Sequence, residues 1–173
     1  MAPIVSSPLP SGSLLARHAK PGDHGDCYTI DVPHAVPLAA FVEAFYTSAG
    51  FRPERLVLAL IGRGGNAADA RALARGETGR FAAWRVEASG DSELLLSDFL
   101  GRTRSWLAVV SLGPAATRLH FGSGIRRREG RGPGARIERA LFRLLLPGHA
   151  VYSRVLLRSA AARLVGAGAD VAV

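Results

Sequence analysis

Four consecutive strand-like segments, separated by very short breaks, constrain the fold of this chain more than any other feature of its sequence. The segments are 80–88, 92–99, 103–112 and 115–122, and the breaks are Ser89-Gly90-Asp91, Leu100-Gly101-Arg102 and Gly113-Pro114. Breaks of two or three residues are typical of β-hairpin turns. The segments therefore predict an antiparallel meander of four strands.

The turns also predict which side chains share a face of this sheet, because the length of a turn fixes the pairing on either side of it. They place Trp84 opposite Leu96, Leu96 opposite Trp106, and Trp106 opposite Phe121. The predicted apolar face carries Trp84, Val86, Leu94, Leu96, Trp106, Val110, Leu119 and Phe121, and the predicted polar face carries Arg85, Glu87, Glu93, Ser97, Thr103, Ser105, Arg118 and His120. An apolar face of this kind needs another element to cover it.

The rest of the chain supplies one further strand and several helices. Residues 26–32 alternate as a strand does, and 136 to about 165 follow a long helical pattern that can cover the sheet. Pro147-Gly148 predicts a kink or a division of that helix into two parts. Shorter helices are expected at 37–48, 53–62 and 66–76, and a Gly/Arg-rich linker at 123–135. The expected fold is α+β, an antiparallel meander sheet covered by a long C-terminal helix.

A length of 173 residues fits one domain. We expect a flexible N-terminal arm at 1–25, because this stretch is rich in Pro, Ser and Gly, then a single α+β domain at 26–165 and a tail at 166–173. No stretch resembles a signal peptide or a transmembrane span, so the expected location is the cytoplasm. Cys27 is the single cysteine, which excludes an internal disulfide and a cysteine-based metal cluster.

The charge is basic, at +8, and comes almost wholly from arginine. Ten arginines lie between Arg126 and Arg163, and only Glu129 and Glu138 oppose them. Abundant Arg, Ala and Gly are also what a GC-rich bacterial genome produces. A basic segment can bind nucleic acid or an anionic membrane, but the cluster at 126–139 lacks the aromatic side chains that stack on bases. A solvated linker and helix face is the preferred interpretation, and nucleic acid is not the expected partner.

Several stretches resemble a bacterial group, domain-of-unknown-function family 2867. They are CYTIDV at 27–32, the hairpin at Ser89-Gly90-Asp91, SDFLGRTRSWLAVV at 97–110, and LLLPGHAVYSRVLLRSA at 144–160. Pro147 and His149 are the most family-like residues, whereas Gly148 stands where members more often have a bulky side chain. The resemblance runs from Asp26 to Arg163 and implies a fold but no activity, because the family has none assigned.

The order of elements also resembles the helix-grip fold of START and birch-allergen-like proteins. That resemblance implies a ligand cavity between the sheet and the C-terminal helix, and apolar or lipid-like ligands.

Two pairs of residues are the candidate site. Asp98 and Arg104 are predicted to lie opposite each other on the apolar face, either as a structural ion pair or as a polar anchor for a ligand. His149 and Tyr152 share a helical face, so His149 is a candidate general acid or base. The predicted ligand-binding residues are Trp84, Leu96, Asp98, Arg104, Trp106, Phe121, His149 and Tyr152, with His149 and Asp98 as candidate catalytic residues.

Three functions stay open at this stage. The first is a domain that binds a small apolar molecule in a cavity between sheet and helix. The second is a cyclase- or dehydratase-like enzyme that transfers protons through His149 or Asp98. The third is a basic interaction protein. The chain has no phosphate loop, dinucleotide fingerprint or metal-ligand spacing, so no cofactor and no metal are expected.

Overall fold

The computed structural model describes residues 2–60, 62–126 and 133–169, with only the backbone given for 133–147 and 168–169. Its strands are β1 (Val5–Ser6), β2 (His24–Val32), β3 (Arg80–Phe81), β4 (Trp84–Ser89), β5 (Glu93–Asp98), β6 (Thr103–Ser111) and β7 (Thr117–Ile125). Its helices are α1 (Leu14–His18), α2 (Leu38–Thr47), α3 (Arg52–Leu60), α4 (Ala67–Ala74) and α5 (Pro133–Ala169).

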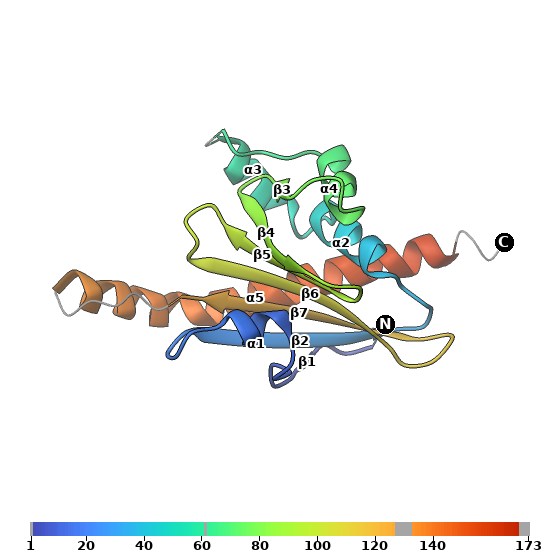
Figure 1. Cartoon of the computed structure of the whole chain (residues 1–173), viewed down its shortest axis with the longest axis horizontal. Helices are drawn as coiled ribbons and strands as arrows, with labels where there is room; N and C mark the ends of the chain where they lie inside the picture. The colour runs from blue at the N-terminus through green and yellow to red at the C-terminus, as the bar shows by residue number, and fades with distance from the viewer. Residues whose placement is uncertain (1, 61, 127–132, 170–173) are drawn as a thin grey trace.

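Within the described residues the strands form one antiparallel sheet in the order β1-β2-β7-β6-β5-β4-β3 (Figure 1). Strands β3 to β7 form a meander. Strand β2 pairs with β7, and β1 lies at the edge of the sheet beyond β2. The long helix α5 crosses one face. The predicted α+β class, with a meander sheet and a long C-terminal helix, is confirmed.

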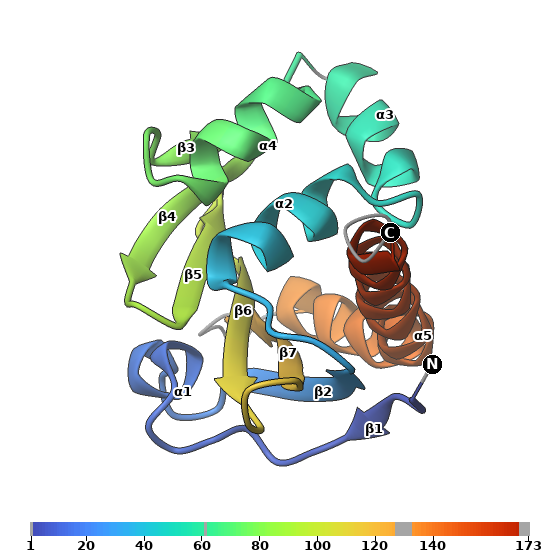
Figure 2. The same ribbon diagram turned by 90° about the vertical axis from the view of Figure 1, so that its right-hand side faces the viewer.

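One face of the sheet, which we call the inner face, packs against α2 and α5 (Figure 2). Helix α2 forms because its apolar residues recur at helical spacing, and it buries Phe41, Phe45 and Tyr46 against the sheet. Helix α5 adds Leu156 and Leu157 to the same core. The sheet contributes Tyr28, Ile30, Val32, Leu94, Leu96, Leu107, Leu119 and Phe121.

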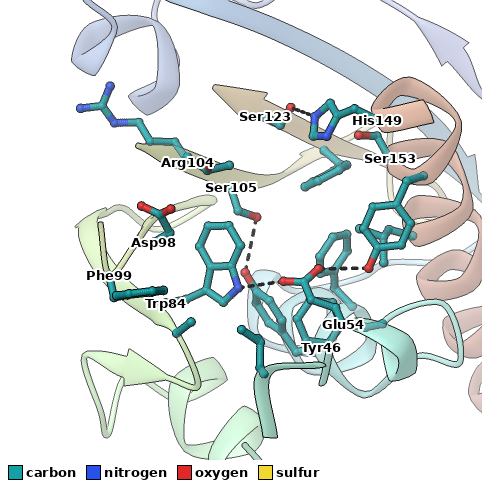
Figure 3. A pocket seen from close by; sticks show the side chains of 18 residues that line it. Tyr46, Glu54, Trp84, Asp98, Phe99, Arg104, Ser105, Ser123, His149 and Ser153 are labelled. Atoms are coloured by element: carbon teal, nitrogen blue, oxygen red, sulfur yellow. Dashed lines mark hydrogen bonds between the residues drawn. The ribbon is translucent and has the colours of Figure 1, made fainter. Parts of the chain in front are cut away.

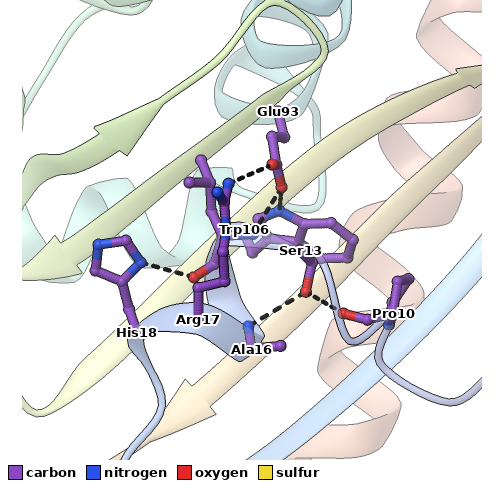
Figure 4. Close-up of polar contacts among 8 residues, drawn as sticks. Pro10, Ser13, Ala16, Arg17, His18, Glu93 and Trp106 are labelled. Atoms are coloured by element: carbon purple, nitrogen blue, oxygen red, sulfur yellow. Dashed lines mark hydrogen bonds and ion pairs between the residues drawn. The ribbon is translucent and has the colours of Figure 1, made fainter.

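The opposite face, which we call the outer face, is also covered, and the N-terminal residues cover it. Helix α1 buries Leu14 and Leu15 against Trp106. The Glu93 carboxylate accepts hydrogen bonds from the Leu14 amide and from Nε1 of Trp106, both at 2.8 Å (Figure 4). The prediction of a flexible arm at 1–25 therefore differs from the structure: β1 pairs with β2, and α1 docks on the sheet.

Two glycines of β7 make room for this docking. A Cβ on Gly122 would lie 2.9 Å from the Trp106 ring, and one on Gly124 would lie 2.7 Å from Leu15. Real Cβ atoms essentially never approach so closely. Ser123, between the two glycines, points to the inner face.

The predicted face is wrong for one strand, β6, and the predicted pairing of β4 with β5 is shifted, because Trp84 pairs with Asp98 and not with Leu96. In the structure Ser97 pairs with Arg104, and Leu107 pairs with Phe121. Trp106 consequently lies on the outer face, whereas Trp84 lies on the inner face. The meander is correct, but the two tryptophans do not share a face as predicted.

The physical reason lies in the turns around β6. Phe99–Arg102 forms a four-residue turn with Gly101 at a φ of +64°, and residues 113–115 form a three-residue turn, so each turn is one residue away from its predicted length. The first error puts the side chains of β6 on the opposite face from the predicted one. The second error cancels the first, so the side chains of β7 lie on their predicted face. A slip of one residue moves every side chain of a strand to the other face.

Helix α5 runs without a break through Pro147-Gly148, so a division into two helices is not observed. The expected tail at 166–173 belongs to this helix as far as Ala169, and 170–173 lie outside the described residues. Most of the basic cluster at 126–139 also lies outside the side chains that the structure describes.

Candidate functional site

A pocket of about 310 Å³ lies between the inner face of the sheet and α5 (Figure 3). It sits at the end of the sheet where β4 begins and β5 ends, and α2 and α3 complete its wall. Its lining is Phe45, Tyr46, Phe51, Glu54, Leu58, Ala83, Trp84, Asp98, Phe99, Thr103, Arg104, Ser105, Phe121, Ser123, His149, Tyr152, Ser153 and Leu156.

The Glu54 carboxylate lies within this largely aromatic wall. It comes from the first turn of α3, and it accepts hydrogen bonds from Nε1 of Trp84 at 3.2 Å and from the Tyr152 hydroxyl at 3.0 Å. Burial raises the pKa of Glu54, although both hydrogen bonds oppose that shift. Burial and the neighbouring Glu54 charge raise the pKa of the Tyr152 hydroxyl, which keeps it a donor at neutral pH.

Ser153 stands out because its hydroxyl has no hydrogen-bond partner in the described part of the chain. The side chain is 1% exposed, and Oγ makes no hydrogen bond to any described group. Figure 3 places Ser153 beside His149 on α5, at the pocket. Buried polar groups are hydrogen-bonded in the great majority of cases, so this hydroxyl has capacity left for a bound molecule.

His149 belongs to a short chain of hydrogen bonds at the pocket edge. Its Nε2 lies 2.6 Å from Oγ of Ser123, and that hydroxyl donates to Oδ1 of Asp26 at 2.7 Å. Oδ2 of Asp26 lies 3.9 Å from the same imidazole nitrogen. Since the Ser123 proton goes to Asp26, Nε2 of His149 donates to Ser123. A carboxylate, a hydroxyl and an imidazole are therefore connected next to the pocket.

The structure brings most of the predicted site residues to this pocket. Trp84, Asp98, Phe121, His149 and Tyr152 line it, and their role in binding stays a prediction. Leu96 lies on the inner face, fully buried in the core beneath. Trp106 is on the outer face against α1, so it cannot line a pocket on the inner face.

The predicted Asp98–Arg104 pair is wrong. Arg104 borders the pocket, but its guanidinium turns to the other side of the sheet, where it binds the Glu87 carboxylate through two hydrogen bonds of 2.9 and 2.7 Å. Asp23 lies 3.7 Å from the same guanidinium. Asp98 instead accepts a hydrogen bond from the Arg102 amide at 2.7 Å. The cause is the inverted β6, which carries Arg104 to the outer face.

Sequence reasoning missed Glu54, Ser123 and Ser153. Glu54 lies near the start of a predicted helix, where an acidic residue is common for reasons unrelated to a site. Its spacing offered a better signal, because Phe51, Glu54 and Leu58 share one helical face and that face is otherwise apolar. Ser153, four residues after His149, shares a face with it in the same way. Ser123 gave no signal, since it lies in a stretch that was interpreted as linker.

No group of three or more His, Cys, Asp or Glu side chains among the described residues is arranged to hold a metal ion. No helix in the described part of the chain is both long and apolar enough to cross a membrane. Comparisons with protein-family models, curated proteins and solved structures give no match. The resemblance to family 2867 and to START-like proteins thus stays a prediction, and the function has to be argued from the pocket.

Proposed function

We propose that this chain binds a small, mainly apolar molecule in the pocket between the sheet and α5. The observation that carries the proposal is the buried Ser153 hydroxyl without a partner at an aromatic-lined cavity. Leaving such a hydroxyl unsatisfied costs about 1–3 kcal/mol. A ligand that hydrogen-bonds to Ser153 removes that cost, and the aromatic rings supply the apolar contact that binds its body.

The volume of the pocket narrows the class of ligand. At about 310 Å³ it is near the lower end of the roughly 300–1,000 Å³ that is typical of small-molecule sites. This size favours a compact molecule of one or two rings over a long acyl chain.

Native mass spectrometry tests the proposal directly. Protein purified from a bacterial host should carry extra mass that denaturation releases. Ser153→Leu fills the pocket and should abolish the extra mass, whereas Ala162→Leu adds the same bulk to the exposed face of α5 and should retain it. A second readout is the fluorescence of 2-naphthol, a compact neutral probe. If wild type and Ser153→Leu bind neither a host molecule nor the probe, or bind them equally, the proposal is wrong.

The second candidate is an enzyme that transfers a proton on the bound molecule. The hydrogen-bonded chain from Asp26 through Ser123 to His149 supports it, because such a chain can hold a proton donor at the pocket edge. Incubation in deuterated water tests it: wild type should exchange a carbon-bound hydrogen of the retained molecule, and His149→Gln should bind the molecule without exchanging it.

A further inference from the structure

The sign of the charge in the pocket determines which polar group its ligand can carry. The candidate anion is Glu54, and its two partners, Trp84 and Tyr152, are neutral donors. Among the described side chains, no Arg, Lys or His lies within ion-pair distance of Glu54. Carboxylates that are largely removed from water are ordinarily paired with a cation, and Glu54 has no such partner among the side chains that the structure describes.

The arginine that lines the pocket, Arg104, is not available to a ligand. The Arg104 guanidinium is 7% exposed and is held on the outer face by Glu87 and Asp23. A ligand carboxylate would therefore meet the Glu54 carboxylate, while the arginine among the described lining residues is already paired with Glu87 and Asp23. The geometry disfavours an anionic ligand, and Arg104 does not serve as the polar anchor that the sequence predicts.

The walls around Glu54 suit a positive group. Tyr46 and Trp84 lie next to the carboxylate in Figure 3, Tyr152 donates a hydrogen bond to it, and Phe51 is part of the same wall. The faces of aromatic rings attract cations through their quadrupole, Trp and Tyr most strongly. The oxygen of Ser153 can accept a further hydrogen bond from the same ligand.

We propose that the pocket recognises a protonated amine on an apolar, ring-containing body, with Glu54 as the counter-ion. The inference rests on the proposed function, because it assigns a ligand class to the same pocket. The ammonium group donates to the Glu54 carboxylate beside Trp84 and Tyr152, and the apolar body packs along the wall formed by Phe45, Phe51 and Phe121.

Three probes of nearly equal shape test the proposal by fluorescence titration at pH 7. They are 2-(1-naphthyl)ethylamine, which is cationic, 2-(1-naphthyl)ethanol, which is neutral, and 1-naphthaleneacetate, which is anionic. Wild type should bind the amine roughly 10- to 100-fold more tightly than the alcohol, which is the affinity equivalent of one charge-assisted hydrogen bond. The acetate should bind most weakly.

Glu54→Gln should remove the preference for the amine while it keeps the affinity for the alcohol. Glu43→Gln is the matched control, because it removes one negative charge from α2 at a carboxylate that pairs with Arg71 and does not line the pocket. It should leave all three affinities unchanged. Thermal unfolding of both variants checks that they are folded. The preference of wild type for the amine over the other two probes is measured without any variant.

The outcomes separate this inference from the proposed function. If all three probes bind equally, or the acetate binds best, and Ser153→Leu blocks them, the pocket binds small molecules but the amine assignment is wrong. An amine preference that survives in Glu54→Gln also overturns the assignment. If no probe binds and no host molecule is retained, both proposals are wrong.

Discussion

The buried ion pair between Arg104 and Glu87 gives the sharpest test of the structure. Replacing Arg104 with Met keeps the aliphatic stem and removes the guanidinium, which is 7% exposed and hydrogen-bonded twice to a carboxylate that is 24% exposed. Breaking one side of a buried pair costs about 3–5 kcal/mol. Because Glu87 keeps some contact with water, we expect a loss of about 3 kcal/mol in the free energy of unfolding.

The chain contains a matched control for this change. Arg118 binds Asp31 with the same two-bond geometry, at 2.7 and 2.9 Å, on the neighbouring strand, but both side chains are about 40% exposed. Water screens such a pair, so Arg118→Met should leave the unfolding midpoint almost unchanged. The two sites differ in burial and in the second carboxylate, Asp23, that lies near Arg104.

Urea unfolding followed by tryptophan fluorescence measures both losses. A loss of about 3 kcal/mol corresponds to a fall in Tm of about 6–12 °C for a domain of this size. Glu87→Met added to Arg104→Met should recover part of the loss, since it removes the uncompensated carboxylate. Equal losses in the free energy of unfolding for Arg104→Met and Arg118→Met would refute the reasoning. A strong energetic coupling between Arg104 and Asp98 would also refute it.

The dependence of this effect on pH has a definite sign. Arg104 lowers the pKa of Glu87 through hydrogen bonding. The stabilisation is therefore fully present above the unfolded pKa of a glutamate, about 4.3, and is lost as the pH falls through the lower folded value. The penalty for Arg104→Met should shrink accordingly in acid.

Four further predictions concern the pocket, the sheet and helix α5. Ser153→Ala should raise the free energy of unfolding of the empty protein by about 1 kcal/mol, because it deletes an unsatisfied hydroxyl, yet it should weaken ligand binding. A variant that loses stability by urea unfolding would contradict this. Gly122→Ala should destabilise the chain by about 1–3 kcal/mol, since its Cβ meets the Trp106 ring and the Asp26 carbonyl. Gly148→Ala, with open space around its Cβ within α5, should stabilise by about 1 kcal/mol, and the same unfolding assay compares the two. Burial raises the pKa of Glu54, so the folded state holds this proton to higher pH than the unfolded chain, and stability falls as the pH rises above about 4.3. Glu54→Gln should therefore lose less stability than wild type as the pH rises from about 4.3 through the raised folded pKa of Glu54, as measured by thermal unfolding.

The elements of this fold were predictable because their signals are local. Periodicity identified the meander, and helices α2, α3 and α4 lie close to their expected bounds. Asn66 and Asp69 form a capping box at the start of α4, which is a local signal of this kind. The order of strand, helices, meander and long helix was sufficient to fix the α+β class.

The two faces of β6 were not predictable, since Trp106 to Val110 is an unbroken apolar run. Such a run is compatible with either register when both faces of the sheet are covered. The prediction assumed that one face of the sheet is exposed to solvent. That assumption failed because α1 covers the outer face. The arm at 1–25 carries few apolar residues in no regular pattern, so its docking depends on tertiary contacts such as Glu93 with Leu14.

The position of the pocket was predictable from the sequence, but the chemical groups that define it were not. Aromatic residues and His149 indicated where it lies, since the inner face and α5 must meet. Glu54 and Ser153 have unusual environments because the described side chains near them do not include the usual pairing partners. A sequence does not record which side chains lie near one another in the fold. The Asp98–Arg104 pair failed for the opposite reason, because it depended on a single register.

Helix α3 has a consequence for how fast this pocket exchanges its contents. It carries Glu54, yet none of its side chains is fully buried, and Leu56, Val57 and Leu60 face solvent. An element with so little buried apolar contact opens at a small fraction of the global free energy of unfolding. A molecule can therefore enter and leave while the sheet and α5 stay intact. A ligand bonded to Glu54 would tie α3 down, so the group that is recognised would also prolong its own residence time, and differences in affinity would appear mainly in the dissociation rate.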